Sequence, residues 1–420
     1  MSAQQSVRAS SPVASEHASP AAKRRDTIPR PVAFALMAVV LFGLFAAAAA
    51  PSPLLVVYQA RWGFAPWLLT FAFAIYAVAL LVAVLVFGSL SDHVGRRPVI
   101  IGALVVQGIA MTVFLNSGGI GEVIAGRVLQ GLATGAATGA ISALLTDLAP
   151  TGNKKLGGML ASIAPLGGLG VGALVTGLLI QVTTDPSAIF LAFDIVFALG
   201  IVLTFLVKEP ISRRIGAAKS LIPRVAVPTA ARSAFTASIP ALISSWMINA
   251  FYLGLVAAIL QGVFGIHSGL INGAAIALFT ESAAASVLIF RKLSSNTNSL
   301  VGSISLIVGA ALTVIGLESG SLVVFGISAI LGGMGLGLSF SGSVSLIMPH
   351  AQAHERGQLF AAVYVVSYLA FGLPAIAAGL FVASEGLLAV ATTFAIVIIV
   401  IAAVSLGAHI VRGSQAPRSK

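Results

Sequence analysis

The sequence contains no cysteine, and only 8% of its 420 residues are charged. The absence of cysteine excludes disulfides, thiol catalysis and cysteine-ligated metal sites. A soluble domain carries about a quarter charged residues, whereas this chain is 58% hydrophobic and lacks the charge to cover a surface in water. Soluble folds are therefore excluded, and a membrane protein is indicated.

Motifs of other energised or ion-conducting membrane proteins are also missing. No G-x-x-x-x-G-K-[ST] stretch occurs, so we do not expect this chain to pump with ATP. The pair His354-Glu355 lacks the second histidine of a zinc helix. No filter-like T-V-G-Y-G run is present, which argues against a channel. We expect no cofactor, no metal and no enzymatic activity.

Long apolar runs fill most of the chain. A helix needs about 20 apolar residues to cross a bilayer. The runs are continuous rather than alternating, which favours helices over a barrel. We predict an all-α polytopic membrane protein with twelve spans near 32–57, 66–88, 98–117, 121–146, 156–182, 187–207, 236–264, 270–290, 299–317, 321–347, 357–383 and 387–410.

The longest polar interruption divides these spans into two groups of six. It is rich in proline and basic residues, which favours a cytoplasmic linker over a folded domain. The N-terminal tail lacks the apolar core of a signal peptide and is expected to be disordered. We predict two pseudo-symmetric six-helix bundles between two cytoplasmic tails, with boundaries at 1–31, 32–207, 208–234, 235–410 and 411–420.

The basic residues predict how the chain sits in the membrane. Of the 23 Lys and Arg residues, 21 fall in segments on one side, and Arg61 and Arg127 are the exceptions. Because positive segments stay cytoplasmic, we predict a multi-pass protein of the plasma (inner) membrane with both termini in the cytoplasm. The net charge of +11 then faces anionic lipid, and no nucleic-acid partner is expected.

The loop between the second and third spans carries a specific motif. It reads Gly88-Ser-Leu-Ser-Asp92-His-Val-Gly95-Arg96-Arg97-Pro98. This loop resembles the G-x-L-x-D-x-x-G-R-R signature of the major facilitator superfamily. The stretch Arg127-Val-Leu-Gln130-Gly131 on the fourth span continues the resemblance, which covers about residues 32–410. The resemblance implies a twelve-helix transporter of the drug or sugar efflux type.

In that family the loop acts as a conformational latch on the cytoplasmic side. The resemblance implies that Asp92 faces the start of the eleventh span near 355–358, where a helix N-terminus favours a carboxylate by about 0.3–1 kcal/mol. Arg96 or Arg97 then bridges Asp92 to an acid at the end of the fourth span. Retention of the loop by its positive charge alone is the alternative. The predicted latch residues are Gly88, Asp92, Gly95, Arg96, Arg97 and Asp147.

The loop after the eighth span is the counterpart of the latch loop in the second half. Residues 290–296 contain neither the glycines nor the acid of the motif. We therefore expect no second latch of this kind.

A cation inside the fourth span indicates a functional or structural partner. Arg127 lies about 9 Å inside the outer end, at a rise of about 1.5 Å per residue. A charge at that depth usually faces a cavity or a partner. We predict a substrate cavity lined by this helix face and by polar stripes on the seventh and eleventh spans, with interhelical hydrogen bonding as the alternative. The predicted residues are Arg127, Gln130, Thr134, Asn249, Tyr252, Tyr364 and Tyr368.

Two acids lie well inside predicted spans, away from their ends. Glu281 is about midway along the eighth span, which borders the cavity in the family resembled, and Asp194 lies in the sixth span. Desolvation favours the protonated form of a carboxyl, so both groups can carry a proton. We predict proton coupling through Glu281, Arg127 and Asp194, with Glu281 foremost. A neutral glutamic acid that stabilises packing, and an Asp194 paired to a neighbouring helix, are the alternatives.

Glycines on the fourth and fifth spans predict close helix packing. The fifth-span element resembles one found in antiporters of the family, although Ala173 stands where a proline is expected. The predicted packing residues are Gly131, Gly135, Gly168, Gly172 and Gly177. In addition, one sequence offset relates the first two of these glycines to Gly333 and Gly337, which is a weak internal repeat.

These features predict a secondary active transporter in which two halves rock around a central site. An apolar, aromatic cavity favours proton-coupled efflux of lipophilic or amphipathic compounds (drugs) or sugars. A proton-coupled uptake carrier for a small-molecule nutrient is the main alternative. A non-transporting sensor of this fold is disfavoured because the latch residues are present. The expected partners are a small-molecule substrate, protons and the bilayer, and a monomer is expected.

Overall fold

The computed structural model describes residues 28–150, 152–153, 155–183, 185, 187–211, 215–352 and 354–415, with side chains described up to residue 410. Within these residues, twelve helices are long and apolar enough to cross a membrane. The predicted all-helical, twelve-span fold is thereby confirmed. Most of the predicted N-terminal tail lies outside the described residues.

The first half contributes six spans. They are α1 with α2 (Arg30–Ala49 and Pro51–Trp62), α3 (Pro66–Phe87), α5 (Arg96–Leu115), α6 (Ile120–Leu148), α7 (Lys155–Val182) and α8 (Ala188–Leu206). A short α4 (Ser91–Val94) occupies the loop before α5, and α9 (Ala217–Ser220) lies in the central linker.

The second half repeats this plan. Its spans are α10 with α11 (Arg232–Gly254 and Val256–Gly262), α12 (Gly269–Ile289), α13 (Ser295–Glu318), α14 (Leu322–Ile347), α15 (Arg356–Glu385) and α16 (Leu387–Gln415). The turns η1 (Thr229–Ala231) and η2 (Met348–His350) precede α10 and follow α14. Thus α10 begins inside the segment predicted to be linker.

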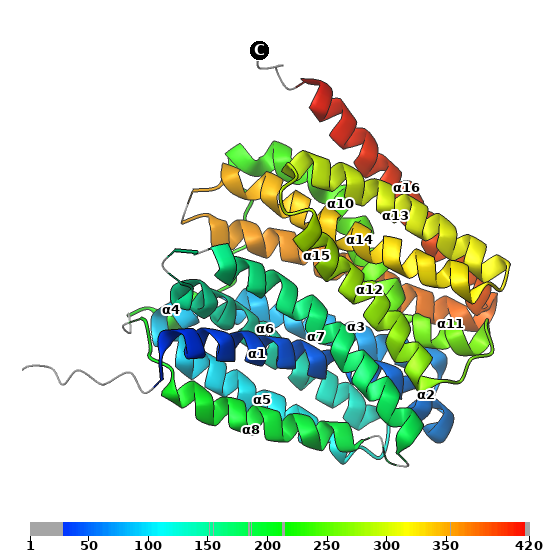
Figure 1. Cartoon of the computed structure of the whole chain (residues 1–420), viewed down its shortest axis with the longest axis horizontal. Helices are drawn as coiled ribbons and strands as arrows, with labels where there is room; N and C mark the ends of the chain where they lie inside the picture. The colour runs from blue at the N-terminus through cyan, green and yellow to red at the C-terminus, as the bar shows by residue number, and fades with distance from the viewer. Residues whose placement is uncertain are drawn as a thin grey trace, which may run out of the picture.

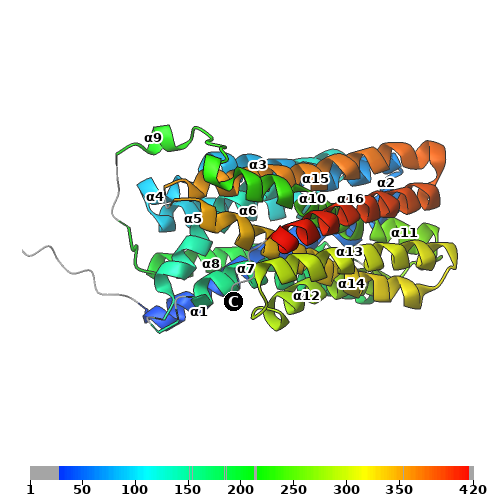
Figure 2. The same ribbon diagram turned by 90° about the horizontal axis from the view of Figure 1, so that it is seen from above.

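The two halves lie side by side as two helical bundles (Figure 1). Each half buries its own apolar core, one built mainly from α1 to α8 and the other mainly from α10 to α16. In both halves the first span is broken near one end of the molecule, between α1 and α2 and between α10 and α11. We call this end the α11 end and the opposite end, which holds α4 and α9, the α4 end (Figure 2).

The break after α1 has a cause in the sequence. Pro51 has no backbone N–H, so the carbonyl of Ala47 loses its normal donor four residues on. The carbonyl keeps a 3.3 Å bond from the backbone N–H of Ala50, and its second lone pair can accept another donor. The side chain that replaces this donor comes from α6, as described below.

The glycine repeat marks equivalent helix contacts in the two halves. A Cβ on Gly131 would lie 2.4 Å from the carbonyl oxygen of Tyr76, so α6 presses directly on the α3 backbone. A Cβ on Gly333 would lie 2.0 Å from the carbonyl oxygen of Phe279, so α14 presses likewise on α12. The fourth helix of each half is therefore seated on the second helix through glycine.

The halves meet through α3 with α15 and α7 with α12. Near the α11 end, a Cβ on Gly177 of α7 would lie 2.3 Å from the carbonyl oxygen of Gly269 in α12. A Cβ on Gly379 of α15 would likewise overlap the side chain of Thr70 in α3. The halves are thus in tight contact at the α11 end.

Candidate functional site

A cavity of about 640 Å³ lies between the halves at the α4 end. The end of α3 with α4, the central linker and the start of α15 form its walls. Its lining includes Val84, Leu85, Gly88, Asp92, His93, Lys219, Arg224, His354, Gln358, Phe360 and Tyr364. A molecule of drug size fits a cavity of this volume.

A row of aromatic rings continues inward from this cavity. Tyr364 contacts Tyr368 with ring centroids 5.9 Å apart, and Tyr368 meets Trp246 of α10 edge-on at 4.6 Å. Trp246 also contacts Phe371 at 6.2 Å, and Phe371 contacts Phe73 of α3 at 5.4 Å. We call these five residues the aromatic strip. It connects the cavity to the seam between the halves.

Polar atoms around the aromatic strip are buried without partners in the described residues. They are the Tyr76 hydroxyl, Trp246 Nε1, Asn249 Oδ1 and the Ser367 hydroxyl. The Tyr76 ring packs in one cluster with Tyr368, which places these atoms on both sides of the seam. Because buried polar groups are normally hydrogen-bonded, such a set marks a place where a ligand can bond.

The aromatic strip was only partly predicted. Of the residues predicted to line the cavity, Tyr364 does so, Tyr368 continues the aromatic strip inward, and Asn249 is buried one turn from Trp246. The sequence analysis did not predict Trp246, Phe73 or the neighbouring Tyr76. Trp246 could have been found from its i, i+3 spacing with Asn249 on one helix face.

Arg127 is fully buried, and its donors bind backbone carbonyls rather than an open cavity. Nη1 donates to the carbonyl of Ala48 at 2.8 Å and to Gln130 Oε1 at 2.7 Å, and Nε donates to the carbonyl of Ala72 at 3.2 Å. Gln130 Nε2 donates at 2.9 Å to the Ala47 carbonyl, which also accepts a 3.3 Å bond from the backbone N–H of Ala50. Arg127 and Gln130 therefore join α6 to α1 and α3.

The Arg127 network lies directly behind the aromatic strip. The guanidinium stands over the Phe73 ring at 5.3 Å and the Tyr76 ring at 4.4 Å. The buried hydroxyl of Thr134 donates to the carbonyl of Gln130. Arg127, Gln130 and Thr134, which were predicted to line the cavity, therefore form hydrogen bonds within the first half. The rings of Phe73 and Tyr76 lie between the guanidinium and the second half.

Tyr252 requires a correction, because it lies in the core of the second half. It is fully buried, its hydroxyl is 2.7 Å from the hydroxyl of Ser328 and 3.3 Å from that of Thr313, and its ring stacks on Phe279 at 4.5 Å. Gly332 makes room for the ring, since a Cβ there would already lie 3.4 Å from it. Tyr252 is not available to line the predicted cavity.

The latch motif forms a charge cluster at the α4 end. Arg96 Nη1 lies 3.2 Å from Asp92 Oδ1, and Arg96 Nε lies 2.8 Å from Asp147 Oδ2. Arg96 is the arginine that bridges the two acids. Arg97 instead donates from Nη2 to the carbonyl of Phe205 at 2.7 Å, where α8 ends.

The carboxylate at a helix N-terminus is Glu209 and not Asp92. Glu209 accepts hydrogen bonds from the backbone N–H groups of Arg96 at 3.0 Å and Arg97 at 2.8 Å, in the first turn of α5. Gly95 permits the turn with φ 103° and brings Glu209 close. Asp92 is 56% exposed and shares the cavity lining with Gln358 near the start of α15. The predicted contact between Asp92 and the start of α15 is therefore not formed in this conformation.

The acids within the spans lie away from the cavity. Glu281 is exposed on α12 and lies beside Gly167 and Gly170 of α7. It shares a helix face with the exposed Leu278 and Leu288. The prediction that Glu281 lies in the cavity wall therefore needs correction. Asp194 accepts a hydrogen bond from the Thr112 hydroxyl at 3.1 Å and pairs α8 with α5.

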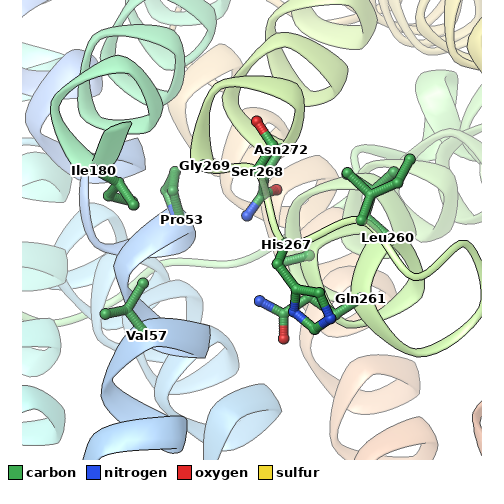
Figure 3. A pocket seen from close by; sticks show the side chains of 11 residues that line it. Pro53, Val57, Ile180, Leu260, Gln261, His267, Ser268, Gly269 and Asn272 are labelled. Carbon is green, nitrogen blue, oxygen red and sulfur yellow. The ribbon is translucent and has the colours of Figure 1, made fainter. Parts of the chain in front are cut away.

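A small pocket lies at the α11 end. Its volume is about 30 Å³, and Figure 3 shows around it Pro53 of α2, Ile180 of α7, Leu260 of α11 and His267 of the loop before α12. In contrast to the cavity at the α4 end, this pocket has room for no more than a few water molecules.

Comparison with known proteins agrees with this geometry. The family model described as Major Facilitator Superfamily matches residues 37–375. The inner membrane transport protein YajR of Escherichia coli (strain K12) is 34% identical over 154 residues, which are 36% of this chain and 33% of YajR. The match therefore spans about a third of that relative.

Two solved structures are similar to the chain along most of its length. A POT family transporter in complex with 5-aminolevulinic acid has a TM-score of 0.71 at 14% identity, covering 91% of this chain and 98% of that one. A mutant of the peptide transporter POT has a TM-score of 0.67 at 14% identity, covering 90% and 94%. At this identity the similarity shows the fold alone.

Proposed function

Because the chain belongs to the major facilitator superfamily, we propose that it exports small amphipathic compounds by proton-coupled alternating access. The family makes it a multi-pass membrane protein and a secondary transporter of a small molecule rather than an enzyme. Substrate class, direction and coupling ion are our proposals, and they rest on the site.

One observation carries the substrate proposal: the cavity leads to the aromatic strip and its unpaired polar atoms. Aromatic walls with a few polar groups suit a compound with an apolar body and one or two polar substituents. Trp246 Nε1 offers a donor and Asn249 Oδ1 an acceptor close to the rings. This combination favours amphipathic compounds over sugars, which need more polar partners.

The placement of charge supports the proposed direction. The basic segments favour a cytoplasmic α4 end, with both termini on that side. The cavity then opens to the cytoplasm, where an exporter collects its substrate. When the cavity closes, we expect Asp92 to reach the start of α15, where a helix N-terminus favours a carboxylate. The Arg96 cluster would hold Asp92 in position for that contact.

We assign proton coupling to Glu281. Within the described residues its carboxyl forms no hydrogen bond or ion pair, while Asp194 already has Thr112 as a partner. Glu281 lies across the seam from Gly170, so movement of α7 against α12 changes its surroundings. An unpaired carboxyl at such a place can take up and release a proton during the cycle.

The coupling is tested in proteoliposomes with an imposed pH step. Glu281→Gln mimics the protonated form, and we expect it to abolish uphill transport while binding in detergent is unchanged. Asp194→Asn is the matched control and is expected to keep uphill transport. Intact pH-driven accumulation in the Gln variant would remove Glu281 as the coupling group and make Asp194 the next candidate.

The function itself is tested in cells with and without the protein. A panel of dyes, antibiotics and sugars is followed with and without a proton uncoupler. We expect lower accumulation of amphipathic compounds when the protein is present, and loss of this difference with the uncoupler. Higher accumulation of a nutrient would instead support the alternative, a proton-coupled uptake carrier.

A further inference from the structure

We propose that the central linker builds a cationic subsite at the mouth of the cavity, and that this subsite binds the anionic group of an amphipathic organic anion. The inference rests on the proposed export function and narrows its substrate class. The two cations of the subsite are Lys219 and Arg224, which both line the cavity.

The linker is fixed to both halves across the mouth. The Ser89 hydroxyl of the first half donates to the carbonyl of Ser220 at 2.9 Å. The backbone N–H of Ala226 donates to the carbonyl of Gln358 in α15 at 3.4 Å. Figure 2 shows α9 at the α4 end beside these elements. Arg224 therefore lies between the two attachment points, and Lys219 directly precedes the first of them.

The charge of this region is unbalanced. Within the described residues neither Lys219 nor Arg224 forms an ion pair, and Asp92, the acid in the lining, already binds Arg96 at 3.2 Å. His93 and His354 line the same cavity and add no negative charge. A concave surface lined by one sign of charge concentrates ligands of the opposite sign.

An apolar surface lies next to these cations. Phe360 and Tyr364 line the same cavity with ring centroids 6.3 Å apart, and Tyr364 begins the aromatic strip. A flat apolar body can stack on these rings while a carboxylate, sulfonate or phosphate reaches Lys219 and Arg224. The combination selects an amphipathic anion over a cation of the same size.

Membrane orientation explains basic residues at this end, but it does not explain why two of them line a cavity. The loop after α12 offers a comparison, because Arg291 and Lys292 are also exposed cations at the α4 end and are absent from the cavity lining. If orientation were the whole role, the two pairs would be interchangeable. The proposal predicts that they are not.

The test measures binding of two matched dyes to the full-length protein in detergent by fluorescence polarisation. Carboxyfluorescein is the anionic probe, and tetramethylrhodamine methyl ester is the cationic probe of similar size. We expect the double variant Lys219→Gln, Arg224→Gln to bind carboxyfluorescein about tenfold more weakly. The control variant Arg291→Gln, Lys292→Gln is expected to bind it like wild type. The cationic dye is expected to bind no more weakly to either variant.

Two further arms separate the possible outcomes. Wild-type binding of carboxyfluorescein should weaken with added salt, because exposed charges are screened. In nanodiscs, an unchanged affinity when phosphatidylglycerol is added supports a subsite for a soluble anion, whereas loss of dye binding assigns it to lipid headgroups and overturns the proposal. Equal affinity of wild type and the linker variant for carboxyfluorescein also overturns it. Export of the cationic dye alone would leave the proposed function standing and refute only the anion subsite.

Discussion

The fourth helices of the two halves, α6 and α14, are seated alike but held by different chemistry. Both press on the second helix of their half through paired glycines at one sequence offset. In α6 the preceding turn contains Arg127 and Gln130, which bind carbonyls of α1 and α3. At the same offset α14 has Ala329 and Gly332.

The second half fills the corresponding space with a neutral side chain. The Tyr252 ring of α10 packs beside Gly332, and its hydroxyl joins those of Ser328 and Thr313. A charge in a membrane-spanning segment is costly, whereas hydroxyl contacts between helices contribute about 0.6 kcal/mol on average. Both ion pairs found in the described residues also lie in the first half. We infer that the first half carries the conformational control and the second half relies on apolar packing.

The largest expected effect comes from removing the buried cation of α6. Arg127→Ala removes the donor that Arg127 provides to Gln130 and to carbonyls of α1 and α3, and each buried acceptor that loses its partner costs about 1–3 kcal/mol. We expect a large drop in the unfolding temperature in detergent and loss of most transport. Arg127→Lys is expected to restore only part of both, because lysine lacks the planar fork.

The matched control for that change is Arg61→Ala, which removes an exposed arginine at the end of α2. It is expected to unfold and transport like wild type. An Arg127→Ala protein with wild-type unfolding and transport would show that the charged network of the first half is dispensable.

The next effect concerns the latch and appears in transport rather than in stability. Asp92→Asn removes the charge that we expect to meet the start of α15, while Asp147 still holds Arg96 at 2.8 Å. We expect a several-fold lower transport rate with normal membrane insertion and an unchanged unfolding temperature. Ser294→Ala, in the latch-free loop of the second half, is the comparison. Wild-type transport rates in Asp92→Asn would contradict the latch.

A smaller effect is expected at the start of α5. Glu209→Ala removes the acceptor for two backbone N–H groups, a loss similar to that of a helix cap and worth about 0.5–2 kcal/mol. Glu209→Gln keeps one acceptor oxygen and is expected to lie between Ala and wild type. Thermal unfolding of the three proteins measures the order, and an Ala variant as stable as wild type would exclude the anchoring role.

The smallest effect is expected in the second half. Tyr252→Phe keeps the ring stack on Phe279 and removes only the hydroxyl, while Ser328 and Thr313 retain bonds to their own helices. We expect a loss of about 0.5–1.5 kcal/mol in unfolding free energy and normal transport. A transport defect in this variant would return Tyr252 to the substrate path and weaken the contrast between the halves.

The spans were predictable to within a few residues because long apolar runs leave a helix in the bilayer few other choices. The break between α1 and α2 is visible in the sequence at Pro51, but the break at Leu255 has no such marker. The family resemblance also implied that Arg96 or Arg97 bridges Asp92 to Asp147 at the end of the fourth span, and Arg96 makes both contacts.

Positions that depend on the neighbouring helix were not predictable. Helical spacing placed Tyr252 on one face with Asn249, but the Tyr252 side chain packs into the core of its own half. Glu281 was predicted from its depth in the eighth span and from the family resemblance, and neither reveals which neighbouring helix it meets. Glu209 binds a helix start more than 100 residues earlier in the chain, so no local pattern reveals it. Trp246 and Tyr76 gain their significance only when the halves come together across the seam.

The central claim is that transport requires the halves to separate at the α11 end while they close at the α4 end. The chain has no cysteine, so introduced cysteines react without background. Gln181 Nε2 and Ser268 Oγ lie 2.7 Å apart across the seam near the α11 end. Glu318 and Thr392, 3.2 Å apart within the second half, provide the matched control pair.

The decisive measurement is transport by Gln181→Cys, Ser268→Cys before and after treatment with a short reducible thiol crosslinker. Our account predicts that crosslinking abolishes transport, that reduction restores it, and that the crosslinked Glu318→Cys, Thr392→Cys control remains active. Undiminished transport by the fully crosslinked Gln181→Cys, Ser268→Cys protein would contradict alternating access between the two halves.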